Sequence, residues 1–120
     1  LFRSPDFLIA SSEWFAFVPA KEYFDEPGDH ADELETSVMM HYHPELVNLD
    51  EAGDGNYKKF ASQMLNEKVA WIPRNWQNVS QDTGIGNPKK ASAGKGKKYA
   101  EVVVAKYALL FEELVHKELY

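Results

Sequence analysis

The chain has 120 residues, of which 44% are hydrophobic and 13% aromatic, which suffices for the core of one small domain and is too apolar for a disordered segment. No apolar run approaches the roughly 20 residues that a membrane-spanning helix needs, and a net charge of −6 argues against nucleic acid as a general partner. Zero cysteines exclude a disulfide framework and any thiolate metal site, and a cytoplasmic location is the default expectation.

The first 19 residues carry two short apolar stretches. Residues 7–11 form a continuous apolar run, which predicts a buried strand. Residues 13–18 continue apolar up to Pro19, and a proline disfavours helical geometry at the residue before it. A strand followed by an irregular aromatic segment is therefore expected here.

A turn and a helix start follow. Pro27-Gly28 is a turn dipeptide, and Asp32 followed three residues later by Glu35 has the spacing of a capping box. The pattern predicts a helix that begins near Asp32 and ends by His43, because Pro44 cannot continue it.

His30 lies between this turn and the helix start. Asp29 and Glu33 are near enough in sequence to raise the pKa of the imidazole or to fix its tautomer. The residues alone favour a surface or capping histidine, and they leave Glu35 equally open to a capping role and to a ligand role.

The middle of the chain is rich in turns. Residues 60–67 are predicted to form a short helical turn, and residues 69–73 (VAWIP) a brief strand closed by Pro73. Residues 74–90 contain Asn, Asp, Gly and Pro at turn-forming density. Short strands between helices favour an α/β fold.

The last element is predicted to be a long helix. Ser92 is a good N-cap, and apolar residues then recur at three- and four-residue intervals. A run of lysines crosses the start of this helix. Because cations oppose the dipole at a helix N-terminus, we expect acidic groups to compensate these lysines locally. The apolar positions are Tyr99, Val103, Tyr107, Leu110 and Leu114, and the lysines are Lys89, Lys90, Lys95, Lys97 and Lys98.

Two blocks of sequence resemble the creatininase (creatinine amidohydrolase) family. The first is Asp29-His30-Ala31 with Glu35-Thr36-Ser37, Met39-Met40 and Pro44-Glu45-Leu46-Val47; the second is Gly84–Pro88 with Ala91-Ser92-Ala93 and Lys95-Gly96. Their order and separation are similar to those of the C-terminal half of the family, and the resemblance covers nearly the whole chain.

The resemblance implies an α/β fold, part of a three-layer α/β/α creatininase-like sandwich. The family's principal metal-ligand motifs belong to its N-terminal half, and none of them occurs here. We therefore expect residues 1–120 to be the C-terminal portion of a single creatininase-like domain. We also expect this piece alone to bind metal poorly and to be inactive.

The resemblance also implies roles for individual residues. His30 would contact substrate and assist proton transfer at the scissile amide, with Asp29 orienting it. Trp14 would form an aromatic wall of the substrate pocket. Glu35 would ligate a divalent metal, Zn or Mn, whose other ligands lie mostly in the absent half. Creatinine-hydrolysing members have a second Trp where this chain has Glu26, so a different small amide is expected as substrate.

The function implied is metal-dependent hydrolysis of a C–N bond in a small amide or cyclic amide. One alternative is a non-catalytic creatininase-like assembly or interaction module. Another is a formamide hydrolase or deformylase on the same scaffold. The implied assembly is a homo-oligomer, a hexamer by family resemblance, without nucleic acid or membrane as partner.

Overall fold

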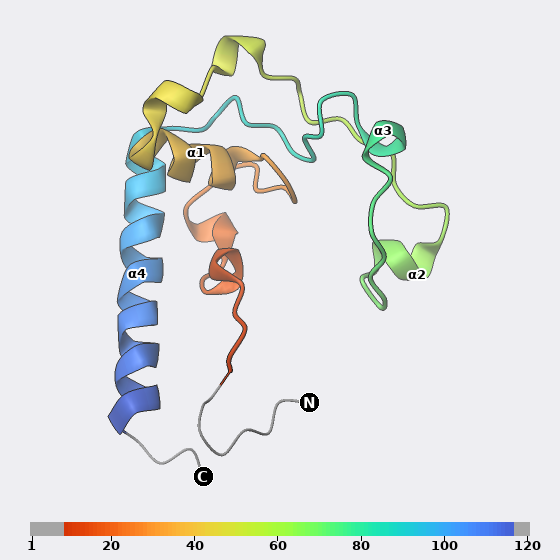
Figure 1. Cartoon of the computed structure of the whole chain (residues 1–120). Coiled ribbons are helices and arrows are strands. Elements are labelled where there is room, and N and C mark those ends of the chain that lie inside the picture. Colours follow the sequence, from red (N-terminus) through yellow and green to blue (C-terminus); the bar gives the residue numbers. More distant parts are fainter. Residues whose placement is uncertain (1–8, 117–120) are drawn as a thin grey trace.

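A computed structural model describes residues 9–116 as helices joined by turns and long connections (Figure 1). The α-helices are α1 (Glu33–Tyr42), α2 (Gln63–Asn66), α3 (Trp76–Val79) and α4 (Ala93–His116). Single turns of 3₁₀-helix are η1 (Trp14–Ala16), η2 (Ala20–Glu22), η3 (Pro44–Leu46) and η4 (Leu49–Glu51).

Helix α1 begins and ends as predicted. The Asp32 side chain caps it, because Oδ1 accepts a hydrogen bond from the Glu35 N–H at 2.9 Å. Glu35 reaches back to accept from the Ala31 N–H at 2.6 Å, one residue before the N-cap Asp32, whose N–H a capping box would use. At the other end the helix stops before His43, and Pro44 opens η3.

Helix α4 is the longest element, and α1 packs across its first turns (Figure 1). Ser92 caps α4 as predicted, with its hydroxyl accepting from the Lys95 N–H at 3.3 Å. The Ser92 N–H donates in turn to the Ser37 hydroxyl on α1 at 3.1 Å. The start of α4 is thus joined to the middle of α1.

The core lies between α1, α4 and the N-terminal turns. Phe24, Leu34, Tyr99 and Val103 form its buried cluster, and Trp14 and Phe17 pack against it from the 3₁₀ segment. The Tyr99 hydroxyl donates to the Phe15 carbonyl at 2.9 Å, which ties that segment to α4.

Neither predicted strand is found among residues 9–116. Residues 69–73 form a bend and an irregular stretch, so the prediction of a strand there was wrong; residues 7 and 8 lie outside the described residues, and 9–11 are irregular. Within residues 9–116 extended pairing is limited to two isolated bridges, His30 with Ile85 and Tyr57 with Ser80. The expected α/β/α layering is therefore not seen in this part of the chain.

Residues 57–80, here called the arm, extend away from α1 and α4 and carry α2 and α3 (Figure 1). The Tyr57–Ser80 bridge closes its base, where the Lys58 N–H also donates to the Val79 carbonyl at 2.8 Å. Among the described residues, no helix combines the length and apolarity needed to cross a membrane.

Candidate functional site

The backbone of His30 is fixed by segment 85–86. The His30 N–H donates to the Ile85 carbonyl at 3.1 Å, and the Ile85 N–H donates to the His30 carbonyl at 2.8 Å. Gly28 allows this close approach, since a Cβ there would stand 2.5 Å from the Ile85 carbonyl oxygen. The two sequence blocks that carry the family resemblance therefore meet at His30.

The imidazole of His30 lies between a carboxylate and an indole. Its Nδ1 stands 3.5 Å from Glu35 Oε2, and its ring centroid is 5.0 Å from that of Trp76 at an interplanar angle of 46°. The side chain is 45% exposed, so solvent or a ligand has access to it. The next residue, Ala31, has φ +49°, a left-handed conformation that costs energy for a residue with a Cβ.

Asp29 has different partners from those expected. Its Oδ1 lies 2.6 Å from Arg74 Nη2 and its Oδ2 lies 3.9 Å from Lys68 Nζ, both on the arm. The carboxylate beside the His30 ring belongs to Glu35. The expected orientation of His30 by Asp29 is thus replaced by an Asp29–Arg74 ion pair, and a catalytic part for Asp29 stays a prediction.

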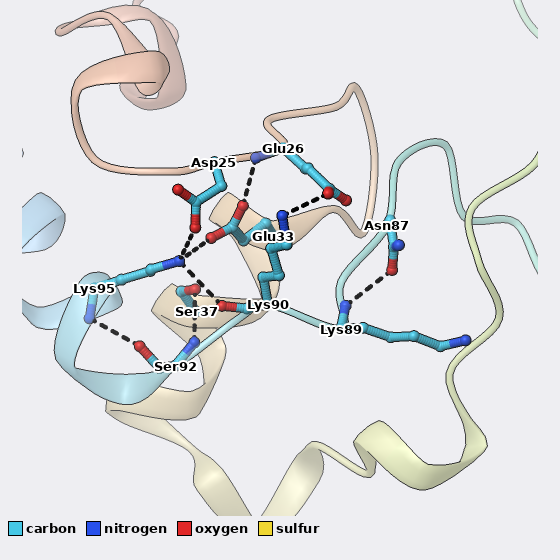
Figure 2. Close-up of polar contacts among 9 residues, drawn as sticks. All are labelled: Asp25, Glu26, Glu33, Ser37, Asn87, Lys89, Lys90, Ser92 and Lys95. Atoms are coloured by element: carbon cyan, nitrogen blue, oxygen red, sulfur yellow. Dashed lines mark hydrogen bonds and ion pairs between the residues drawn. The ribbon is translucent and has the colours of Figure 1, made fainter.

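A buried carboxylate ties the turn that carries His30 to helix α4 (Figure 2). Glu33, fully buried, accepts from the Glu26 N–H at 2.7 Å and from the Lys95 ammonium. Lys95 also binds Asp25 Oδ2 at 2.8 Å, so one lysine joins two acids from this turn region. In a further ion pair, Lys90 Nζ lies 2.7 Å from Glu26 Oε1. The predicted compensation of the lysine run by acids is confirmed for these two lysines.

These ion pairs shift the pKa values of exposed groups in the directions that their charges require. The hydrogen bond from Lys95 lowers the pKa of the Asp25 carboxyl. The hydrogen bonds to Asp25 and then to Glu33 raise the pKa of Lys95. Glu26 raises the pKa of Lys90 in the same way. Each group is held in its charged form across the neutral pH range.

A cavity of about 420 Å³ opens beside α1. Glu35 lines it and also faces His30 Nδ1, so one carboxylate connects the imidazole with the cavity. Two further carboxylates, those of Glu51 and Asp82, line the same space. The remaining lining residues include Ala31, Thr36, Met39, Leu46, Val47, Gly55, Gly84, Gly86 and Pro88. The volume falls in the range of small-molecule sites.

Trp14 lies in a different environment. Its ring packs edge-on against Tyr99 at 6.2 Å and belongs to the periphery of the core cluster. The aromatic ring that contacts His30 is that of Trp76. The substrate-wall role of Trp14 stays a prediction.

A metal centre is not assembled by the described residues. No group of three or more His, Asp or Glu residues within 9–116 could hold a metal ion. Glu35 is occupied by the Ala31 N–H and by the His30 ring, and the described side chains do not complete a coordination shell around it. These residues alone therefore do not fit the expected metal.

Sequence reasoning missed Trp76 and Arg74. Both fall in the turn-rich stretch, where no periodicity or motif relates them to His30, 44 or more residues earlier in the chain. The only local signal is the arginine two residues before a tryptophan, a spacing that allows the guanidinium to stack on the indole. Arg74 Cζ does stand 5.4 Å from the Trp76 ring centroid.

Comparison with known proteins agrees with this arrangement. The family model Creatininase, described as creatinine amidohydrolase, matches residues 6–111. A crystal structure from Bacteroides fragilis NCTC 9343, named as a candidate creatinine amidohydrolase, is 60% identical with a TM-score of 0.86. The match covers 97% of this chain and 46% of that one, so the chain spans about half the length of its solved relative. Among curated proteins none matches significantly.

Proposed function

Because this chain belongs to the creatininase family, we propose that it forms part of an amidohydrolase that cleaves a C–N bond in a small amide or cyclic amide. The observation that carries the proposal is the position of Glu35, which faces both the exposed His30 ring and the cavity beside α1. An imidazole beside a carboxylate that lines a small-molecule cavity is a suitable acid–base pair for amide cleavage.

In this proposal His30 binds the amide and delivers a proton to the leaving nitrogen. Glu35 holds the imidazole through Nδ1, which leaves Nε2 for the substrate. Asp29 contributes indirectly, since its carboxylate holds Arg74. Trp14 remains a proposed substrate wall, contributed from the edge of the core.

The charge of the cavity restricts the substrate class. Glu35, Glu51 and Asp82 line the cavity and would repel an anionic ligand in a partly enclosed space. Carboxylates accept hydrogen bonds and suit N–H donors. We therefore propose a neutral or cationic amide that presents N–H groups to this wall.

A second substrate type is favoured by Glu26. In creatinine-hydrolysing members this position is a tryptophan, whereas here Glu26 lies 2.7 Å from Lys90 in an ion pair. An acid bound to a lysine supplies no aromatic face for a flat ring. An open-chain amide or formamide on the same scaffold is therefore the second candidate.

A divalent ion, Zn or Mn, is proposed for the complete enzyme on family grounds. Because the described residues do not assemble a site, its ligands would come mostly from outside this chain, with Glu35 as the tentative contribution from this one. The same proposal places these 120 residues as the C-terminal portion of a longer α/β/α domain, inactive alone. Intact mass and metal content of the purified protein test it: metal-loaded, active material of only 13.7 kDa would contradict it.

The catalytic proposal is tested by two histidine substitutions in the purified whole protein. His30→Ala should lower kcat for amide hydrolysis by about 100-fold or more, the usual range for general acid–base catalysis. His43→Ala is the matched control, since His43 also pairs with a glutamate, Glu45 at 3.3 Å, but lies beyond the other end of α1. Thermal unfolding should be similar for both variants.

The substrate set should include a cyclic lactam and a formamide, which separates the two enzymatic candidates. Equal activity of His30→Ala and the unsubstituted protein on every substrate would contradict the assignment of His30. Complete absence of hydrolysis by the unsubstituted protein would favour a non-catalytic assembly module. A cytoplasmic homo-oligomer, hexameric by resemblance, is part of the proposal, and sedimentation analysis tests the oligomer.

A further inference from the structure

The arm returns to the turn that carries His30 through three consecutive contacts. Asp29 Oδ1 lies 2.6 Å from Arg74 Nη2, Arg74 Cζ lies 5.4 Å from the Trp76 ring centroid, and that ring lies 5.0 Å from the His30 ring. Asp29 and His30 are neighbours in sequence, so the four side chains form a closed circuit. The circuit joins the arm to the imidazole of His30, which is 45% exposed.

Each contact in this circuit restricts the next side chain. The guanidinium is planar and presents a rigid fork, so binding Asp29 restricts the position of the cation that lies over the indole. The Asp29 and Arg74 side chains are only 29% and 27% exposed, so this ion pair is partly shielded from solvent. The indole in turn covers one side of the imidazole, whose other ring contact is the Glu35 carboxylate at Nδ1.

The two tryptophans of the arm differ in exposure, and the one that contacts His30 is the less exposed. Trp71, five residues earlier on the same arm, is 79% exposed, whereas Trp76 is half-buried. The Trp76 and His30 rings meet at an interplanar angle of 46°, and this contact with the indole restricts rotation of the imidazole. An indole on one side of the imidazole and a carboxylate 3.5 Å from Nδ1 together narrow the range of orientations open to the His30 ring.

We infer that Trp76 is a positioning residue for His30, and that the Arg74–Asp29 ion pair holds Trp76 in place. The catalytic part of this inference rests on the proposed function, in which His30 serves the reaction. Its structural part does not, since it concerns only the covering and orientation of the His30 ring. Asp29 thereby acts on His30 through two intervening side chains.

Diethyl pyrocarbonate labelling tests the structural part without any activity assay. The reagent acylates accessible imidazoles, and peptide mass spectrometry separates His30 from His41, His43 and His116. In the whole protein, Trp76→Ala should raise the labelling rate of His30 several-fold while leaving that of His43 unchanged. Trp76→Phe should restore most of the protection. Trp71→Ala, the matched control, should leave the labelling of His30 unchanged.

Two substitutions test the ion pair. Arg74→Lys keeps the charge but loses the planar guanidinium, and Asp29→Asn removes the charged partner of Arg74. Both variants should raise the labelling rate of His30, by less than Trp76→Ala does. In the hydrolysis assay Trp76→Ala should lower kcat with little change in KM, because it disturbs orientation more than ground-state binding. Circular dichroism melting verifies that each variant is folded.

The outcomes separate the two proposals. Unchanged His30 labelling in Trp76→Ala overturns the inference, and so does increased labelling with kcat intact. Increased labelling with reduced kcat, reversed by Trp76→Phe, supports it. If the unsubstituted protein hydrolyses no amide, the proposed function fails, while the labelling comparison with Trp71→Ala still decides whether Trp76 holds His30.

Discussion

The Glu33 carboxylate, with no exposed surface, is bound by the ammonium of Lys95, which lies 62 residues later in the chain. Glu33 is the first residue of α1, and Lys95 lies in the first turn of α4. The pair therefore fixes the start of the helix that follows His30 against the start of the longest helix. A buried carboxylate needs such a partner, because an unpaired one would carry a large desolvation cost.

Glu33→Gln should lower the free energy of unfolding by about 2 kcal/mol, since the amide cannot replace a charge-assisted hydrogen bond in a buried place. Asp25→Asn is the matched control: Asp25 binds the same Lys95 ammonium, but its side chain is 63% exposed, so its loss should have a small effect. Urea unfolding of both variants measures the difference. Equal effects of the two substitutions would show that burial of Glu33 does not determine the strength of this contact.

The local features of α1 and α4 could be predicted from sequence because nearby residues determine them. Asp32 and Ser92 cap the N–H groups three residues after them as the spacing indicated, while Glu35 binds the Ala31 N–H four residues before it. The burial of Tyr99 and Val103 likewise follows from helical periodicity. Sequence spacing suffices where a contact spans one turn of helix.

The strand predicted at residues 69–73 is absent because strand formation, unlike helix capping, depends on residues far away in the sequence. An apolar run becomes a strand only when another strand pairs with it, and residues 69–73 have no ladder partner within residues 9–116. Val69 and Trp71 are largely exposed there. The Trp76–His30 contact was likewise missed, because it depends on where the arm returns and on no local spacing.

The two glycines in the first turn of α4 should respond in opposite ways to alanine. A Cβ at Gly96 would collide with the backbone carbonyl of Ser37 on α1, whereas a Cβ at Gly94 meets no atom within 4 Å. Gly96→Ala should therefore lower the free energy of unfolding by about 2 kcal/mol or more through forced separation of the helices. Gly94→Ala should raise it by up to about 1 kcal/mol through helix propensity.

Chemical denaturation of the two glycine variants measures this difference. If Gly96→Ala proved as stable as the unsubstituted protein, the close packing of α1 on α4 would be incorrect.

Tyr99→Phe should lower the free energy of unfolding by about 1 to 2 kcal/mol. The Tyr99 hydroxyl, buried in the core, donates to the Phe15 carbonyl at 2.9 Å, and its loss leaves that carbonyl without this donor. Tyr107→Phe is the matched control, since Tyr107 lies about two helical turns further along α4. Its hydroxyl pairs with Ser12 Oγ at 2.8 Å in an exposed position, so its removal should change stability by less than about 0.5 kcal/mol.

Alkaline pH should destabilise the fold through groups on α4 whose pKa values are raised. Burial raises the pKa of Tyr99 above its ordinary 10.0, and the hydrogen bonds to Asp25 and Glu33 raise that of Lys95 above 10.5. In both cases the unfolded chain releases its proton first. The stabilising contribution is therefore complete below about pH 10 and is lost as pH rises through the folded-state pKa values.

Urea unfolding at about pH 9 and about pH 11 measures this loss, and Tyr99→Phe apportions it. A phenylalanine cannot ionise, so this variant should lose less stability between the two pH values than the unsubstituted protein does. Tyr107→Phe, which leaves Tyr99 and Lys95 in place, is the control for removing a phenol elsewhere on α4. Identical pH dependence in all three proteins would mean that Tyr99 ionises equally easily in the folded and unfolded chains, which is incompatible with its burial against Phe24 and Val103.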